Sequence, residues 1–332
     1  MVSTTELTHL TWLYPVYQRI TQAFLTGHGH HALLLRTPND NGGEQFCFTL
    51  AQWLLCEHKQ AEQACGHCRQ CQLFQHQSHP DFYWIAAEKG KKISIESIRE
   101  VIDKLSRHSQ QTAAKVVYIQ GVELLTEAAA NALLKTLEEP TEHCYFLLQT
   151  DIEHQLLATI YSRCQLWTLP QPTLDQAVKW LIEQGFPQSE ALQTALTMNY
   201  YRPFAAKKSL EEGEVAQRLD FLRQFWKFYR NKNLLMLFPY VQLDNPIPQL
   251  NWIEAFLMDT LKCALGIHTG WQCQDLRQGV ETLAQQLPAL KIYQGLSIIR
   301  QMRTDLLTIN GVNQELIVVD GLIKIIEEVF EG

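Results

Sequence analysis

Residues in the first half of the chain alternate between short, mostly apolar runs and longer segments with apolar residues at helical spacing. The runs are residues 30–36, 81–87, 116–119, 145–148 and 165–169. Runs of this length are typical of strands that are buried on both faces of a sheet. Amphipathic helices are predicted between them, at residues 44–57, 95–109 and 126–139. This alternation predicts an α/β domain built on a doubly wound, mostly parallel sheet.

The pattern changes after Pro170-Gln171-Pro172, because no strand-like run follows. Three short helices are predicted over residues 173–210, and about five longer ones between Val215 and Phe330. We therefore expect three parts, namely an α/β domain over residues 1–170, a small helical domain over 171–212 and an all-α domain over 213–332. An aromatic row at residues 221–229 follows helical spacing, which favours a core or subunit interface over a platform for stacking bases.

Length and composition set the class of protein. The chain has 332 residues, of which 46% are hydrophobic, which is enough for several domains with cores of their own. It has no run of about 18 apolar residues, and its first ten residues lack the features of a secretory signal, so we expect a cytoplasmic protein without a membrane segment. The net charge of −7 excludes whole-molecule attraction to nucleic acid, so any such contact must be local or shared with partners.

Four of the nine cysteines lie close together, at Cys56, Cys65, Cys68 and Cys71. Thiolates at these spacings can converge on one soft cation at tetrahedral angles. A structural zinc ion is therefore predicted, in a module at about residues 56–71 that is inserted between a helix and the next strand. A Cys-x-x-Cys redox pair and a set of disulfides are the alternatives. Four histidines lie nearby and could replace one thiol, although four sulfurs already complete the shell. These are His58, His67, His76 and His79.

The loop after the first predicted strand, residues 37–44, has the place of a phosphate-binding loop. Set against the pattern Gly-x-x-x-x-Gly-Lys-Ser/Thr, Gly42 keeps the final glycine, Gly43 replaces the lysine and Glu44 replaces the magnesium-binding hydroxyl. The run at 116–119 is followed by Gln120 and a glycine instead of the acidic pair that holds magnesium. Because the cation for the phosphates and the acids for the metal are both missing, we expect the fold of a nucleotide hydrolase without hydrolysis.

Three motifs occur in order along the chain. They are the spacing Cys56-x8-Cys65-x2-Cys68-x2-Cys71, the stretch AANALLKTLEEP from Ala129 to Pro140, and the tripeptide Ser162-Arg163-Cys164. In these motifs the chain resembles clamp-loader subunits of the AAA+ class, those of bacterial DNA polymerase III in particular, and the likeness extends from about Trp12 to the C-terminus. The resemblance implies an AAA+-like α/β domain with an inserted zinc module, a helical lid domain, and a helical collar domain that closes a five-subunit assembly.

The resemblance also implies partners and functional residues. Gamma, tau and delta subunits would be direct partners, and the sliding clamp, the polymerase core and primer-template DNA would be met through the assembly. Arg163 would act as an arginine finger in trans, on the ATP site of a neighbouring subunit. The tripeptide alone also fits a surface arginine in an ordinary salt bridge. In the lid, Pro203 or Phe204 takes the place of a nucleotide-sensing arginine, and Arg202 is the alternative, displaced counterpart.

The sequence leaves three functions open. A clamp-loader subunit without ATPase activity of its own, as a component of a DNA-directed DNA polymerase (a nucleotidyltransferase), agrees with all three motifs. An active ATPase of the gamma or tau type is disfavoured by Gly43 and Gln120. A free-standing zinc adaptor that binds nucleic acid should have a basic module, but the segment between Cys56 and Cys71 contains as many acidic as basic residues.

Overall fold

The computed structural model describes residues 4–88, 90–105, 114–309, 311 and 313–331. The chain forms two compact units, of which unit 1 comprises residues 1–180 and 202–204 and unit 2 comprises residues 181–201 and 205–332. The expected division into three domains at residues 170 and 212 stays a prediction. Within the described residues, no helix combines the length and the apolar character that a membrane span requires.

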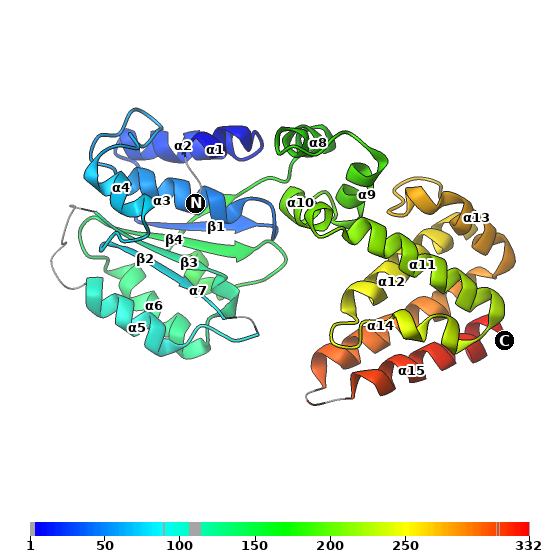
Figure 1. Ribbon diagram of the computed structural model, residues 1–332. Helices are drawn as coiled ribbons and strands as arrows, with labels where there is room; N and C mark the ends of the chain where they lie inside the picture. The colour runs from blue at the N-terminus through cyan, green and yellow to red at the C-terminus, as the bar shows by residue number, and fades with distance from the viewer. Residues whose placement is uncertain (1–3, 89, 106–113, 310, 312, 332) are drawn as a thin grey trace. The chain divides into compact units, whose positions relative to one another are not determined.

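Unit 1 is built on a five-stranded parallel sheet with helices on both faces (Figure 1). The strands are β1 (Ala32–Thr37), β2 (Phe82–Ala86), β3 (Lys115–Gln120), β4 (Cys144–Asp151) and β5 (Gln165–Thr168). They lie in the order β2-β3-β4-β1-β5, and each pair of neighbours is parallel. Leu34 in β1 is opposite Leu148 in β4 and Leu166 in β5. The predicted doubly wound parallel sheet is therefore confirmed.

The helices of unit 1 form two layers (Figure 1). One face of the sheet carries α1 (Thr4–His9), α2 (Tyr14–Leu25), α3 (Gly43–Leu55) and α4 (Arg69–Gln75), and the other carries α5 (Ile95–Leu105), α6 (Glu127–Glu138) and α7 (Ala158–Tyr161). The hydroxyl of Thr126 accepts a hydrogen bond from the Ala129 N–H and caps α6, as predicted. The end of the predicted helix at 95–109 lies outside the described residues.

Helices α1 and α2 were not predicted from the sequence. The inner face of α2 carries buried Val16, Tyr17 and Ile20, and Leu13 before it is also buried. This is the spacing of an amphipathic helix, so the signal was present in the sequence. The two helices complete one layer of unit 1 and place Trp12, which lies between them, next to the loop after β1.

The helical half of the chain agrees with the prediction. The three short helices are α8 (Leu174–Glu183), α9 (Glu190–Met198) and α10 (Pro203–Glu211). The five longer ones are α11 (Glu214–Asn231), α12 (Ile247–Ala264), α13 (Arg277–Gln286), α14 (Ala289–Thr308) and α15 (Gln314–Lys324), which continues as a π-helical turn at Ile325–Phe330. Short 3-10 turns lie at Val122–Leu124, Leu234–Met236, Phe238–Tyr240 and Gln274–Leu276.

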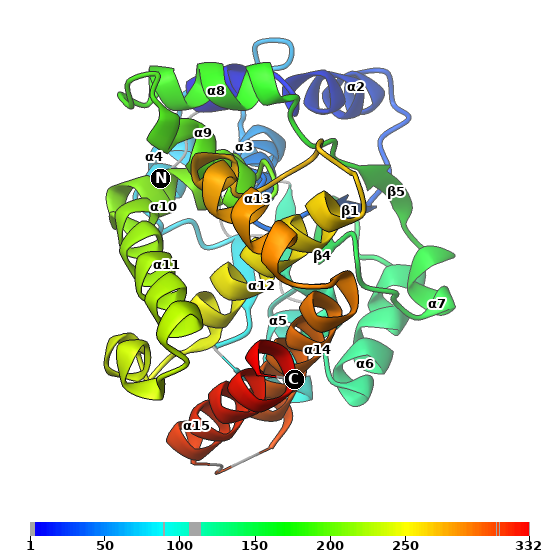
Figure 2. The same ribbon diagram turned by 90° about the vertical axis from the view of Figure 1, so that its right-hand side faces the viewer.

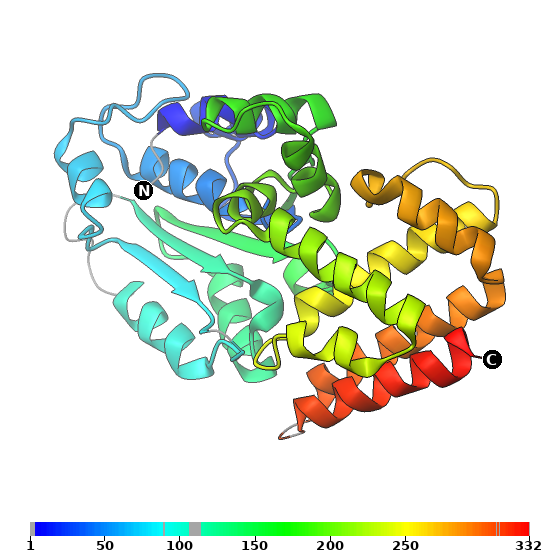
Figure 3. The ribbon, with the colours of Figure 1, turned by 45° about the vertical axis from the view of Figure 1, so that its right-hand side comes forward.

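Helix α12 is central to unit 2, where it packs against α11, α13 and α14 (Figures 2 and 3). The aromatic row of α11 supplies Phe221, Phe225 and Phe228 to this core, and Phe225 meets Phe256 of α12 with 6.2 Å between the ring centroids. The buried half of the row is therefore part of the core, as its helical spacing indicated.

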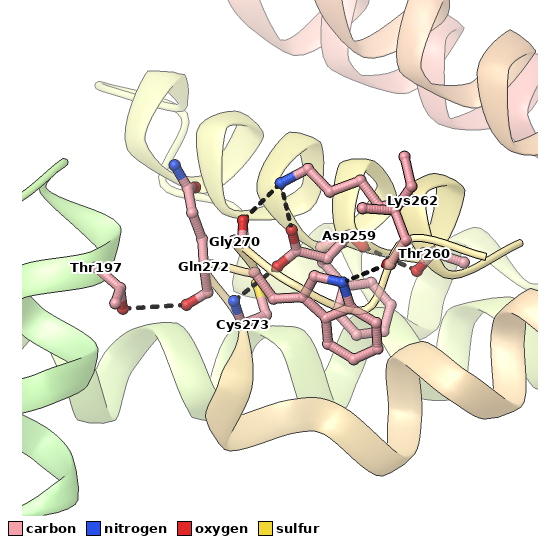
Figure 4. Close-up of polar contacts among 10 residues, drawn as sticks. Thr197, Asp259, Thr260, Lys262, Gly270, Gln272 and Cys273 are labelled. Carbon is pink, nitrogen blue, oxygen red and sulfur yellow. Dashed lines mark hydrogen bonds and ion pairs between the residues drawn. The ribbon is translucent and has the colours of Figure 1, made fainter. Parts of the chain in front are cut away.

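A buried carboxylate of α12 holds the loop that follows this helix (Figure 4). Asp259, with 1% of its side chain exposed, accepts a hydrogen bond of 2.7 Å from the Cys273 N–H and lies 3.2 Å from Lys262 Nζ. Lys262 also donates to the Gly270 carbonyl at 2.7 Å, and Thr197 of α9 donates to the Gln272 carbonyl at 3.2 Å. These contacts fix α9 and the 265–273 loop to α12 within unit 2.

Candidate functional site

The loop between β1 and α3, residues 37–44, is called the phosphate loop below. Gly42 has a φ of 91°, a left-handed conformation that glycine adopts without strain, and α3 begins at Gly43. A Cβ atom at Gly43 would lie 2.6 Å from Thr37 Cγ2 and 2.9 Å from Gln149 Nε2. A lysine fits at this position only if its neighbours shift, because atoms in a packed interior do not approach that closely.

Gln149, in β4, is held against the phosphate loop by two buried donors. The Tyr118 hydroxyl and the Cys47 thiol both donate to its Oε1 atom, the thiol at 3.8 Å. Burial raises the pKa of both Tyr118 and Cys47, so each keeps the proton that it donates. Because three buried polar groups satisfy one another here, moving Gln149 away would leave unpaired donors in the core.

An amide stands at the sequence position where the pattern has a magnesium-binding acid. Gln120, at the end of β3, donates from Nε2 to Glu44 Oε2 at 3.2 Å and accepts from Trp84 Nε1 at 3.3 Å. An amide in this position brings no negative charge, and the carboxylate that it contacts lies where the pattern requires a hydroxyl. The two departures that the sequence showed separately therefore contact each other in space.

Aromatic side chains pack around the other side of the phosphate loop. The Trp12 indole donates to the Asn41 carbonyl at 3.1 Å, and the Phe204 N–H donates to the Asp40 carbonyl at 3.2 Å. Trp180 packs on both rings, with centroid distances of 6.2 Å to Trp12 and 4.7 Å to Phe204. Groups of unit 1 thus donate hydrogen bonds to two backbone carbonyls of the phosphate loop.

Arg202, the alternative candidate for a nucleotide-sensing arginine, is engaged by its own chain. Its NH2 atom lies 3.5 Å from Glu153, in the turn after β4. The side chain is 26% exposed. The guanidinium of Arg202 therefore pairs with a carboxylate of unit 1.

The four cysteines of the predicted zinc module come together in space. Their sulfurs all lie within 4.8 Å of one another, with 3.6 Å between Cys56 and Cys65 and 4.0 Å between Cys65 and Cys71. Tetrahedral bonds of about 2.3 Å to zinc place sulfurs about 3.8 Å apart. All four are free thiols, so the disulfide alternative is not what the structure has. The cluster could hold one metal ion.

Backbone amides point at these sulfurs in the manner that stabilises thiolates. The Cys65 N–H donates to Cys56 Sγ and the Cys68 N–H to Cys65 Sγ, both at 3.3 Å, and the Cys71 N–H donates to Cys68 Sγ at 3.5 Å. Burial acts to raise the pKa of the Cys65 thiol, but hydrogen bonds from His67 and Cys68 outweigh it and lower this pKa to about 7. Burial raises the pKa of the Cys56 and Cys71 thiols, so the amides favour the thiolate at Cys65 and Cys68 and not at all four sulfurs.

The nearby histidines take no part in this cluster. Among the described residues, the only His, Cys, Asp and Glu side chains that converge closely enough to hold a metal are the four cysteines. His67 Nδ1 contacts the Cys65 carbonyl at 2.8 Å, and His79 Nδ1 accepts from the Asp81 N–H at 3.1 Å. In both histidines the Nδ1 atom therefore contacts a backbone group.

Arg163 lies at the end of α7 and is 31% exposed. Its guanidinium pairs with Glu138 of α6, with Nε donating to Glu138 Oε1 at 2.6 Å. NH1 donates to the Thr159 carbonyl at 3.0 Å and to Ser162 Oγ at 3.1 Å. Two of the three sequence motifs thus meet here, because Glu138 belongs to the LEEP stretch and Arg163 to the Ser-Arg-Cys tripeptide.

Sequence reasoning missed two features of the phosphate loop. Gln149 and Trp12 are distant from the loop along the chain, and neither belongs to a motif. A buried glutamine at the end of an apolar strand was a signal, because such a residue needs partners in the core. Trp12 gave no comparable signal.

Comparison with known proteins gives a family. The profile described as "DNA polymerase III, delta subunit" matches residues 14–173, and "DNA polymerase III, delta subunit, C terminal" matches residues 212–327. The chain is 46% identical over 320 residues to DNA polymerase III subunit delta' of Haemophilus influenzae, with 96% of this chain and 98% of that protein covered. It is 36% identical over 316 residues to DNA polymerase III subunit delta' of Escherichia coli, with 95% and 94% covered.

One solved structure shows the same fold. It is a gamma subunit-related protein of DNA polymerase III from Thermotoga maritima, with a TM-score of 0.51 and 17% sequence identity, and the match covers 95% of this chain and 99% of that one. The expectation of an AAA+-like α/β domain followed by helical parts is therefore confirmed.

The packing at Gly43 generates a stability prediction. Gly43→Ala should lower the free energy of unfolding of unit 1 by about 1–3 kcal/mol, because the new Cβ meets Thr37 and Gln149 in a filled core. Urea unfolding followed by hydrogen exchange of β1 and β4 amides measures this change. The matched control is Gly279→Ala in α13, where a Cβ would lie 3.6 Å from Phe256 and helix propensity favours alanine. Equal stability of Gly43→Ala and wild type would contradict the steric argument.

Proposed function

We propose that this chain, which belongs to the delta-prime subunit family of DNA polymerase III and is a clamp-loader subunit, does not hydrolyse ATP itself. It would work as one subunit of the clamp-loader assembly. In this proposal its partners are the gamma or tau subunits and the delta subunit. The sliding clamp, the polymerase core and primer-template DNA are reached through the assembly. Residues 1–170, 171–212 and 213–332 serve as the AAA+-like domain, the lid and the collar.

The observation that carries the absence of ATPase activity is the contact between Gln120 and Glu44. Hydrolysis of ATP requires a cation beside the terminal phosphates and an acid that holds magnesium. Here Gly43 cannot be replaced by lysine without a clash, and the amide of Gln120 occupies the acid's position while it binds Glu44. A triphosphate at this loop would meet a carboxylate, which repels it.

We propose zinc as the metal of the cysteine cluster, with Cys56, Cys65, Cys68 and Cys71 as its four ligands. Four sulfurs that all lie within 4.8 Å of one another and the three N–H donors support a closed thiolate site. A bound zinc ion would cross-link the end of α3 to the start of α4. Four protein ligands leave no position for water, so the role is structural.

We propose that Arg163 is an arginine finger that completes the ATP site of a neighbouring subunit. A guanidinium is always charged and can neutralise the negative charge that develops during phosphoryl transfer. The pairing with Glu138 is compatible with this role, because Glu138 is 46% exposed and an ion pair that is open to solvent is worth about 0–1 kcal/mol. On assembly, phosphate oxygens could replace that carboxylate at little cost.

The first prediction concerns nucleotide binding. The isolated chain should not bind ATP saturably in the micromolar range with or without magnesium, because no lysine pairs with the phosphates at the phosphate loop. Equilibrium dialysis with labelled ATP measures this directly. Saturable micromolar binding of ATP would contradict this prediction, and hydrolysis by the chain alone would contradict the proposal of a subunit without ATPase activity.

The second prediction concerns metal content. The protein purified without chelator should contain one zinc per chain, and Cys65→Ser/Cys68→Ser should lose it, because two serines cannot replace two thiolates. Elemental analysis gives the stoichiometry. Cys263→Ser is the matched control, since Cys263 is a partly buried thiol of α12 outside the cluster. Full zinc content in the double variant would rule out these ligands.

The third prediction concerns Arg163. Arg163→Ala should leave folding, zinc content and assembly intact, and should reduce ATP-dependent clamp loading by the reconstituted complex at least about tenfold, since fingers in trans contribute about 10³-fold or more at the site they serve. The measurement is the rate of clamp loading onto primed DNA, with subunit stoichiometry determined in the same sample.

Glu138→Gln is the informative control for Arg163. It removes the intramolecular ion pair and keeps the guanidinium, so an arginine finger should remain active in this variant. A merely structural salt bridge predicts equal losses in Glu138→Gln and Arg163→Ala. A fully active, normally assembled Arg163→Ala complex would refute the proposed finger.

A further inference from the structure

A pocket of about 490 Å³ lies in unit 1 beside β2, which is an edge strand of the sheet. Its walls come from the first turns of α3, from α4 and the loop after it, and from β2. Cavities of about 300–1,000 Å³ with mostly apolar walls are the usual size for binding a compact ligand group. None of the roles proposed above uses this space.

The walls of the pocket are aromatic. Phe48 of α3 is the central ring, with centroid distances of 5.2 Å to Trp84 and 5.9 Å to Phe82, and Phe74 lies 4.8 Å from Phe82. Trp84 is 51% exposed, which is unusual for so large an apolar side chain beside a hollow. An inserted aromatic or large aliphatic group would bury this ring and gain edge-to-face contacts.

The wall of the pocket also contains the buried ring of His79. His79 is 6% exposed, and its Nδ1 atom accepts from the Asp81 N–H, which leaves the ring proton on Nε2. That Nε2 atom is buried and has no hydrogen-bond partner among the described residues. Burial lowers the pKa of His79, which keeps the ring neutral. The atom is closed off from solvent, so the binding of a ligand in the pocket does not depend on it.

The charge of the lining selects among ligands. Glu44 lines the pocket and forms no ion pair with any described lysine or arginine, and none of the described lining residues is basic. A phosphate group would be repelled here, which disfavours nucleotides and nucleic acid. A basic group next to the apolar anchor would be attracted.

We propose that this pocket binds a peptide segment of a partner protein, with one aromatic or large aliphatic side chain inserted among Phe48, Phe74 and Trp84, and an adjacent lysine or arginine that faces Glu44. Each element of the peptide matches one feature of the lining. The site shares Glu44 with the phosphate loop, and it is separate from the cysteine cluster and Arg163.

The test uses the full-length chain with isotope-labelled tryptophan. The probe is acetyl-Phe-Lys-amide, and the readout is the indole N–H signal of Trp84, assigned with a Trp84→Phe variant. We expect a saturable shift of this signal. The indole of Trp167, on the opposite edge strand β5, is the internal control and should not move. No saturable shift at Trp84, or equal shifts at both indoles, would overturn the proposal.

Comparison probes and variants define the ligand class. Acetyl-Phe-Glu-amide should bind more weakly than acetyl-Phe-Lys-amide, and Glu44→Gln should remove most of this difference, which an exposed ion pair limits to about fivefold. Trp84→Ala should weaken binding at least about threefold, as expected from the loss of an aromatic pair. Trp84 is half exposed, so this variant should fold. Tighter binding of AMP than of acetyl-Phe-Lys-amide, or unchanged affinity in Trp84→Ala, would refute a peptide pocket.

Discussion

The close approach of Gly43 to Thr37 and Gln149 is the constraint on which the rest of unit 1 depends. Gln149 reaches the phosphate loop because Tyr118 and Cys47 hold its amide from inside the core. Once that amide is fixed, the first residue of α3 has room for a hydrogen atom and for nothing larger. The loss of the phosphate-binding lysine is thus built into the packing between β1, β4 and α3. A side chain at this position would require Thr37 or Gln149 to shift.

Much of the fold could be read from the sequence because its signals are local. The strands of unit 1 are buried on both faces, so Val116 to Ile119 and Tyr145 to Leu148 appear as apolar runs whatever their neighbours are. In the structure β4 continues to Asp151. The sequence did not predict this end of the strand, because Gln149 and Thr150 are polar and find their partners only in the folded structure. Right-handed crossovers place the helices on the two faces once the strand order is known, but the order itself was not predicted.

The candidate sites also differ in whether their signals are local in the sequence. The four cysteines lie within sixteen residues, so their spacing alone brings the sulfurs together, and the prediction of their convergence needed no tertiary contact. The contacts of Gln120 with Glu44 and of Trp12 with Asn41 join residues that are far apart in the chain. Periodicity contains no information about which distant side chains meet, and for this reason the sequence showed what the phosphate loop lacks but not what fills it.

Two paired arginines, Arg218 and Arg163, differ in burial. Arg218 of unit 2 is 1% exposed and lies 2.7 Å from Asp275, so removal of its partner would leave a charge in the core, at a cost of about 3–5 kcal/mol. Arg163 of unit 1 is 31% exposed and pairs with a half-exposed carboxylate, so its charge stays hydrated and the pair costs little to open. An arginine that stabilises its own fold must be difficult to release, whereas one that serves another chain must exchange its partner readily. Arg218 is thus fixed in its own core, whereas the Arg163 pair is open enough for the exchange that the proposed finger requires.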